Sequence, residues 1–213
     1  MLETILAKGG MSGRVTAELR LKLAYMYDSC GRSEEALQEC EKVLTDFPDD
    51  RDLLRGALLR KGWVLSHAER LEESEAVLQA VIRRFDGEPR TVATAKADIA
   101  IHALWEREWL REGVRVTQEA RQGLSPSDPL FATLRLREGQ FLEGLGSYEA
   151  ALRVYESVPM MEGSDPHLNA GWETIRGQVR CDCALGRVAE AKSLLAKLQE
   201  AREVTAEAAE SVP

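Results

Sequence analysis

Two histidines in this chain have a type and a spacing that could support chemistry. His67 and His102 lie 35 residues apart, on neighbouring copies of a repeated pattern, so they could face one groove and form a metal or acid–base site. A catalytic zinc site needs three protein ligands, and no third ligand accompanies this pair. We therefore expect neither a metal nor a cofactor at these residues.

The cysteines could support disulfide or metal chemistry, and there are four of them: Cys30, Cys40, Cys181 and Cys183. They are too few and too scattered for a disulfide framework. Cys181 and Cys183 are two residues apart on a predicted helix, so their side chains point in different directions. A zinc site would need paired C-x-x-C units or nearby histidines, and the sequence offers neither. We expect reduced, partly buried thiols.

Motifs of known catalytic sites are missing from the sequence. It has no H-E-x-x-H metal motif, no G-x-S-x-G elbow, no phosphate-binding glycine loop and no dinucleotide fingerprint. The glutamate pairs at 34–35 and 72–73 stand at predicted helix starts, where carboxylates complement the helix dipole. Because these pairs recur with the repeat, we expect them to be structural. The sequence thus predicts a protein that is not an enzyme.

Composition and charge exclude two further classes of protein. The 213-residue chain is 44% hydrophobic and 30% charged, and its abundant Ala, Leu, Glu and Arg favour helix. The net charge of -8 provides no basic surface for nucleic acid. No apolar run is long enough to span a bilayer. The first eight residues lack the basic start and cleavage-like site of a secretory signal, so we expect a cytoplasmic protein.

The elements that position these residues follow from a repeated pattern. Four similar stretches begin at Gly31, Arg70, Gly146 and Gly186. Gly31 and Gly146 are 115 residues apart, which is three steps of about 38, and Gly186 follows 40 residues later. Periods of this length indicate stacked repeats in which each unit contacts its neighbours. Such a chain offers an extended surface rather than a catalytic pocket.

Each repeat is predicted to be a pair of helices. Apolar residues recur at helical spacing on both sides of Gly31, which implies two helices joined by a tight turn. Prolines mark the seams, and the Asp128-Pro129 pair suits a helix N-cap followed by the first helical position. The first helices are predicted over 14–30, 51–69, 90–108, 128–144 and 167–184. The second helices are predicted over 33–47, 72–85, 110–123, 148–160 and 188–206.

Three parts of the chain are expected from this pattern. Residues 1–13 form an N-terminal segment with a flexible joint at its glycines, residues 14–206 form one module of five repeats, and residues 207–213 form a polar tail. The last part is rich in Glu and Ala with few large apolar residues, so we expect the final helix to fray.

The repeats resemble the tetratricopeptide repeat, whose pattern places small residues where the two helices cross and a proline at the close. In the first repeat the matching residues are Tyr27, Gly31, Ala36 and Pro48. In the fourth they are Gly139, Gly146, Tyr148, Ala151, Tyr155 and Val158. The crossing position of repeats two, three and five is held by Ser74, Gly113 and Ala191. The resemblance covers about residues 17–203 and implies an all-α, right-handed α-solenoid of about five helix-turn-helix repeats.

One departure concerns the period. The usual tetratricopeptide unit has about 34 residues, whereas this one averages nearer 38. The longer unit is similar to the bacterial form found in envelope-assembly and Tol-associated repeat proteins. Those proteins are normally exported or lipid-anchored, and their location does not carry over because this chain shows no export signal.

The resemblance also implies where a partner binds. In this family the first helix of each pair lines the concave wall. That register places Leu21, Asp98 and Glu143 there, together with eleven candidate partner-binding residues: Lys22, Tyr25, Arg60, Trp63, His67, His102, Trp105, Arg137, Gln140, Arg176 and Arg180. A mixture of Tyr, Trp and Arg is typical of interface hot spots. We expect the aromatic residues to anchor an extended or helical peptide and the basic residues to pair with its carboxylates. The alternative is that the aromatics fill the core between repeats and the basic residues are only solvated.

The function expected from these features is an adaptor that binds a segment of a protein partner in the concave groove. A self-assembling structural module or oligomerising regulatory domain, with homo-oligomers formed through the terminal repeats, is one alternative. A chaperone for a secreted or assembling partner is another, because it would use the same groove.

Overall fold

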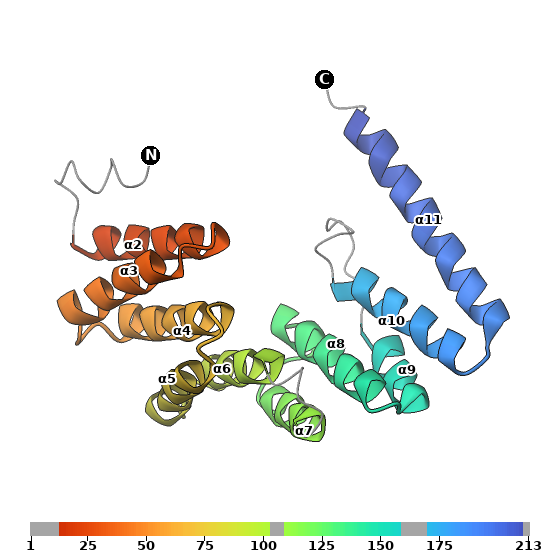
Figure 1. Cartoon of the computed structure of the whole chain (residues 1–213), viewed down its shortest axis with the longest axis horizontal. Coiled ribbons are helices and arrows are strands. Elements are labelled where there is room, and N and C mark those ends of the chain that lie inside the picture. The colour runs from red at the N-terminus through yellow and green to blue at the C-terminus, as the bar shows by residue number, and fades with distance from the viewer. Residues whose placement is uncertain (1–12, 103–108, 159–169, 211–213) are drawn as a thin grey trace. The chain divides into compact units, whose positions relative to one another are not determined.

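The computed structural model describes residues 13–102, 109–158 and 170–210 (Figure 1). In these ranges every regular element is a helix and no strand is present. Side chains are described over 13–100, 109–158 and 172–199. The helices are α2 (Gly13–Ser29), α3 (Ser33–Asp46), α4 (Arg51–His67), α5 (Leu71–Arg84), α6 (Pro89–His102), α7 (Leu110–Arg121), α8 (Pro129–Gly144), α9 (Tyr148–Glu156), α10 (Ala170–Ala184) and α11 (Val188–Glu210).

These helices confirm the predicted all-α repeat fold, and their bounds lie within a few residues of the predicted ones wherever the structure describes the chain. The first helix of the third pair, predicted to reach residue 108, is described as far as His102. The final helix is predicted to end at 206, and α11 continues to Glu210. The long run of Ala and Glu explains this extension, since both residues favour helix.

A left-handed residue joins the two helices of four pairs. Gly31, Gly146 and Gly186 have φ of 73°, 71° and 75°, and Glu69 takes the same place in the second pair with φ 59°. The following residue closes the turn by donating its backbone N–H to the helix it leaves, as Arg32 does to the Tyr27 carbonyl at 2.9 Å. This is the usual way to end a helix with a residue of positive φ.

The seams between repeats are made by N-caps, as predicted for Asp128. Its carboxylate accepts the Leu130 N–H at 2.9 Å, and Pro129 occupies the first turn of α8. Asp50 does the same for α4, accepting the backbone N–H groups of Asp52 and Leu53 at 3.1 Å. Each cap satisfies donors that a helix start leaves unpaired.

The chain divides into two compact units, residues 1–102 (unit 1) and residues 103–213 (unit 2). Unit 1 contains α2 to α6 and unit 2 contains α7 to α11, so the third predicted pair is shared between the units. The expectation of one continuous module over 14–206 therefore stays a prediction.

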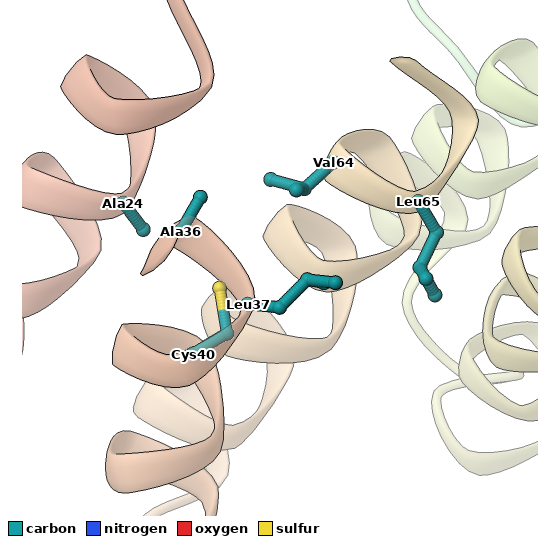
Figure 2. Packing of buried hydrophobic residues seen from close by; sticks show 6 residues of the cluster. All are labelled: Ala24, Ala36, Leu37, Cys40, Val64 and Leu65. Carbon is teal, nitrogen blue, oxygen red and sulfur yellow. The ribbon is translucent and has the colours of Figure 1, made fainter. Parts of the chain in front are cut away.

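Small residues let the helices of unit 1 approach closely. Ala24 and Ala36 are fully buried where α2 crosses α3. Both belong to one core cluster, and Figure 2 shows them next to each other. In the second pair the crossing residue Ser74 is buried, and its hydroxyl donates to the Gly62 carbonyl at 2.8 Å. This hydrogen bond satisfies a hydroxyl that would otherwise be buried without a partner.

Unit 2 uses glycine for the same purpose. The core of α8 to α10 is built around Tyr155, which is fully buried. A β-carbon on either Gly139 or Gly177 would overlap the Tyr155 ring, and one on Gly113 would overlap the Phe141 ring. The absence of a side chain at these glycines therefore makes room for the aromatic residues.

Candidate protein-binding surface

The first helices of unit 1 lie next to one another, because α4 packs against both α2 and α6 as well as against its own partner α5. This arrangement brings residues of successive repeats onto one surface. We call the surface formed by Lys22, Tyr25, Arg60, Trp63 and His67 the first-helix face of unit 1.

Tyr25 and Arg60 meet across the boundary between the first two repeats. The Tyr25 side chain is on α2 and 53% exposed. The Arg60 guanidinium, from α4, lies 5.0 Å from the centre of the Tyr25 ring. A cation over an aromatic face gains about 0.5–1 kcal/mol at an exposed site. About half of the side chain remains accessible to solvent, so Tyr25 is not part of the core.

Trp63 and His67 stand one turn apart on α4, and their rings pack edge to face with centres 4.5 Å apart. The His67 Nδ1 lies 2.8 Å from the Asp28 carboxylate of α2. Asp28 is buried and its other carboxylate oxygen has no hydrogen-bond partner. His67 therefore ties the first repeat to the second, in addition to supporting the Trp63 ring.

The cations on the first-helix face differ from most arginines of unit 1 in that they form no ion pair with a described carboxylate. Arg20, Arg55 and Arg70 pair with carboxylates of the chain at 2.7–3.2 Å. Within the part of the chain that the structure describes, Lys22 and Arg60 form no such ion pair. Two unneutralised cations beside an accessible tyrosine ring are suited to an acidic, partly apolar ligand.

Asp98 of α6 is an acidic group close enough to Arg60 to be influenced by its charge. The residue is buried. Burial raises the pKa of the Asp98 carboxyl to about 7, while the positive charge of Arg60 acts in the opposite direction. The carboxyl is therefore a weak counter-ion for Arg60 near neutral pH. The repeat register assigns Asp98 to the inner face but does not anticipate its burial.

A hollow of about 500 Å³ opens between α4 and the start of α6. It is lined by Arg55, Leu59, Glu88, Pro89, Arg90, Thr91 and Thr94. Sequence analysis missed this hollow, although Leu59 lies one turn before Trp63 on the same helix and could have indicated it. The hollow adds an apolar side chain and threonines to the first-helix face.

Glu88 fixes the rim of this hollow. Its carboxylate accepts from Arg51 at 2.8 Å, from Arg55 at 2.9 Å and from the Thr91 hydroxyl at 2.9 Å. These donors hold the pKa of the Glu88 carboxyl down at about 2. Arg55 also pairs with Asp52 at 2.9 Å, so the two guanidiniums are matched by two carboxylates. The cluster links α4 to α6 and positions the rim rather than offering free charge.

The predicted residues of unit 2 are bound up in contacts within the chain. Arg137 donates to the Gln140 side chain at 2.8 Å, and burial lowers the pKa of the Arg137 guanidinium. Arg176 pairs with Glu173. Arg180 donates to both oxygens of Glu143, at 2.6 and 3.0 Å. Their role in binding stays a prediction.

The remaining residues with candidate roles lie away from this surface or outside the described chain. The side chains of His102 and Trp105 fall outside the described residues. Trp109, at the start of α7, is exposed. Cys40 and Cys181 are buried free thiols, and burial raises their pKa values to about 12 and about 11. Such thiols are poor nucleophiles.

Metal ligands and membrane-spanning helices are both missing from the described part of the chain. It contains no group of three or more His, Cys, Asp or Glu side chains that could hold a metal ion. None of its helices is both long enough and apolar enough to cross a membrane.

Comparison with known proteins supports the repeat fold. The tetratricopeptide repeat model matches residues 17–46, which span most of α2 and all of α3. No curated protein sequence matches the chain. Similar solved structures include BtubC (BKLC) from P. vanneervenii, with 15% identity over 91% of this chain and 84% of that one and a TM-score of 0.77.

Two others are similar over nearly their whole length. The TPR-like repeats of a putative kinesin light chain from Podosopora anserina share 14% identity over 92% of this chain and 99% of that one, with a TM-score of 0.69. TTC0263, a thermophilic TPR protein in Thermus thermophilus, shares 19% over 86% and 90%, with a TM-score of 0.58. At these identities the likeness shows the fold. Residues 17–46 thus match a tetratricopeptide repeat, and the described part of the chain is all-α with the fold of tetratricopeptide-repeat solenoids.

Proposed function

We propose that this protein is a non-enzymatic adaptor that binds a segment of a partner protein on the first-helix face of unit 1. The observation that carries the proposal is the exposed Tyr25 ring with the Arg60 guanidinium beside it. Lys22 lies three residues before Tyr25 on the same helix, and neither cation has a carboxylate partner among the described residues. Aromatic rings and arginines dominate the energy of protein interfaces. The tetratricopeptide-repeat fold, which generally serves as a scaffold for protein interactions, supports the same class of function.

The chemistry of the surface favours an acidic segment with at least one apolar side chain. Its carboxylates would pair with Arg60 and Lys22, where a charge-assisted hydrogen bond is stronger than a neutral one. Its apolar side chain would lie on Tyr25 or Trp63, or enter the hollow beside Leu59. A chaperone that holds an assembling partner would use this surface in the same way and would differ only in the protein it binds.

A peptide array tests the proposal without requiring a named partner. The array carries random segments with acidic, neutral and basic composition, and the readout is the affinity of the selected peptides by fluorescence anisotropy. We expect acidic segments to be selected, and Arg60→Glu or Trp63→Ala to weaken their binding at least tenfold.

Arg83→Glu is the matched control for these variants. Arg83 is an exposed residue near the end of α5, outside the first-helix face, and its replacement makes the same change in net charge as Arg60→Glu. The control should bind like the wild type. Equal loss of binding in Arg60→Glu and Arg83→Glu would show that net charge alone governs binding and would overturn the assignment of the site.

A further inference from the structure

The left-handed turn residues allow positions in different repeats to be compared directly. Gly31 and Glu69 are equivalent, so adding 38 (69 − 31) takes a residue of the first repeat to its counterpart in the second. Gly31 and Gly186 are equivalent as well, so adding 155 (186 − 31) takes it to the last described repeat. With these two shifts, an exposed residue of the first or last described repeat can be compared with the equivalent residue that is buried between two adjacent repeats.

The interface between α3 and α4 is the reference for such a comparison. From α3 it uses Leu37 and Cys40, which cluster with Val64 of α4 (Figure 2). Further along the same two helices, Val43 clusters with Leu53 and Ala57. All three α4 residues are at most 4% exposed.

The outward face of α2 has apolar side chains at the same three positions. Val15 corresponds to Leu53 (15 + 38), Leu19 to Ala57 (19 + 38) and Met26 to Val64 (26 + 38). Instead of being buried, Val15 is 43% exposed and Met26 is 51% exposed. Leu19 is half-buried. The face of α2 that matches the α3-binding face of α4 is thus apolar, with two of its three apolar side chains exposed.

The outward face of α11 is the opposite half of the same interface. Leu195 corresponds to Cys40 (40 + 155), which is fully buried against α4, and Leu195 is 45% exposed. Val188 corresponds to Ser33 (33 + 155) and is 56% exposed. The last described helix therefore exposes an α3-like face, and the first exposes an α4-like face.

The polar replacements on the two faces are matched in position. Leu44 of α3 packs against the cluster that contains Leu54 of α4. The equivalent of Leu44 on α11 is Gln199 (44 + 155), and the equivalent of Leu54 on α2 is Thr16 (54 − 38). An apolar contact in the reference interface thus becomes a contact between two hydrogen-bonding side chains. Lys192 in place of Leu37 (37 + 155) would lay its aliphatic stem along this contact.

We propose that a second copy of this chain docks head to tail, with the α11 outward face of one copy on the α2 outward face of the next, as α3 packs on α4. The contact is heterologous, because each copy contributes a different face, so it leads to chains or rings of copies rather than to a symmetric dimer. It uses other side chains than the first-helix face. The polar replacements make it weaker than the packing of repeats within one chain, and association is reversible.

The test uses one variant for each face. Met26→Glu places a charge on the α2 face and Leu195→Glu places one on the α11 face; both positions are exposed, so each variant should keep the helical circular dichroism of the wild type. Sedimentation velocity over a dilution series should show wild-type mass rising with concentration and each single variant remaining monomeric. Arg83→Glu, which changes the net charge by twice as much at a site away from both faces, should associate like the wild type.

An equimolar mixture of the two variants distinguishes this contact from any symmetric one. Met26→Glu retains an intact α11 face and Leu195→Glu retains an intact α2 face, so the mixture should form a one-to-one dimer and nothing larger. A wild type that stays monomeric at millimolar concentration, or a mixture without dimers, would overturn the proposal. A monomeric wild type whose melting temperature falls on Met26→Glu would instead show that another segment of this chain covers α2, which also overturns it.

Discussion

At the scale of single residues, the room left by glycine decides how closely the helices of unit 2 approach. Tyr155 lies between Gly139 of α8 and Gly177 of α10, and it donates its hydroxyl to Glu143 at 2.9 Å. The ring thus has backbone without a side chain on both of its sides. A methyl group on either side has no space unless the ring moves, and the partly buried hydrogen bond to Glu143 resists that movement.

We expect Gly139→Ala to lower the free energy of unfolding by roughly 1–3 kcal/mol, the usual effect of overpacking a core. Gly144→Ala is the matched control on the same helix, because its β-carbon would meet the Leu110 side chain at an ordinary 3.4 Å. The control should be neutral or slightly stabilising, since alanine favours helix. Urea denaturation measures both variants, and equal stability of the two would contradict this account of the crossing.

Glu69 illustrates the opposite case, a position where glycine is missing. The other described turns of this kind have Gly31, Gly146 or Gly186, whereas the second repeat places a glutamate at φ 59°. A residue with a β-carbon is strained in this region. We expect Glu69→Gly to raise the free energy of unfolding by about 1 kcal/mol, and Gly31→Ala to lower it by a similar amount; thermal unfolding followed by circular dichroism checks both signs.

At the scale of elements, the helices could be predicted from sequence because their signals are local. The glycines of the turns, the caps such as Asp128 and the 3.6-residue periodicity each act over a few residues. Contacts between repeats could not be predicted in the same way. Arg180 reaches Glu143 and His67 reaches Asp28 across 37 and 39 residues, and the partner chosen depends on side-chain directions that spacing alone does not give.

Burial of Asp98 is another property that the sequence did not reveal. The repeat register assigns the position to the inner face, where an aspartate would be expected to be solvated and charged. In the structure the residue is buried, and the resulting rise in its pKa links the stability of the folded protein to pH.

The sign of that link follows from the direction of the shift. The folded protein binds the Asp98 proton with a pKa of about 7, above the ordinary value of 3.8, so the free energy of unfolding falls as pH rises from about 4 to about 7. Asp98→Asn removes the cost of ionising a buried carboxyl. We expect the variant to melt at a higher temperature than the wild type at pH 8, with a gain in the free energy of unfolding of roughly 4 kcal/mol for a shift of this size, and to differ less at pH 5. Asp49→Asn, at an exposed seam position, should keep the wild-type pH dependence; a variant at 98 that does the same would contradict the assigned burial.

At the scale of the whole molecule, stability in a repeat protein is a sum of the repeats and the interfaces between neighbours. Helices with a neighbour on both sides should therefore open less often than those with one. In unit 2, α8 buries six residues, among them Leu134 and Phe141. Among the described side chains of α11, only Ala191 is buried.

Hydrogen exchange reports this difference and the proposed association together. In dilute solution we expect the amides of α11 to exchange at least tenfold faster than those of α8, because opening α11 exposes little apolar surface. At concentrations where copies associate, the contact of α11 with α2 adds a neighbour, so protection should rise in these two helices and stay constant in α8. In Leu195→Glu, the exchange rates of the α11 amides should not depend on protein concentration. Protection that rises equally in all helices would point to non-specific aggregation, and protection of α11 equal to that of α8 in dilute solution would contradict the neighbour model.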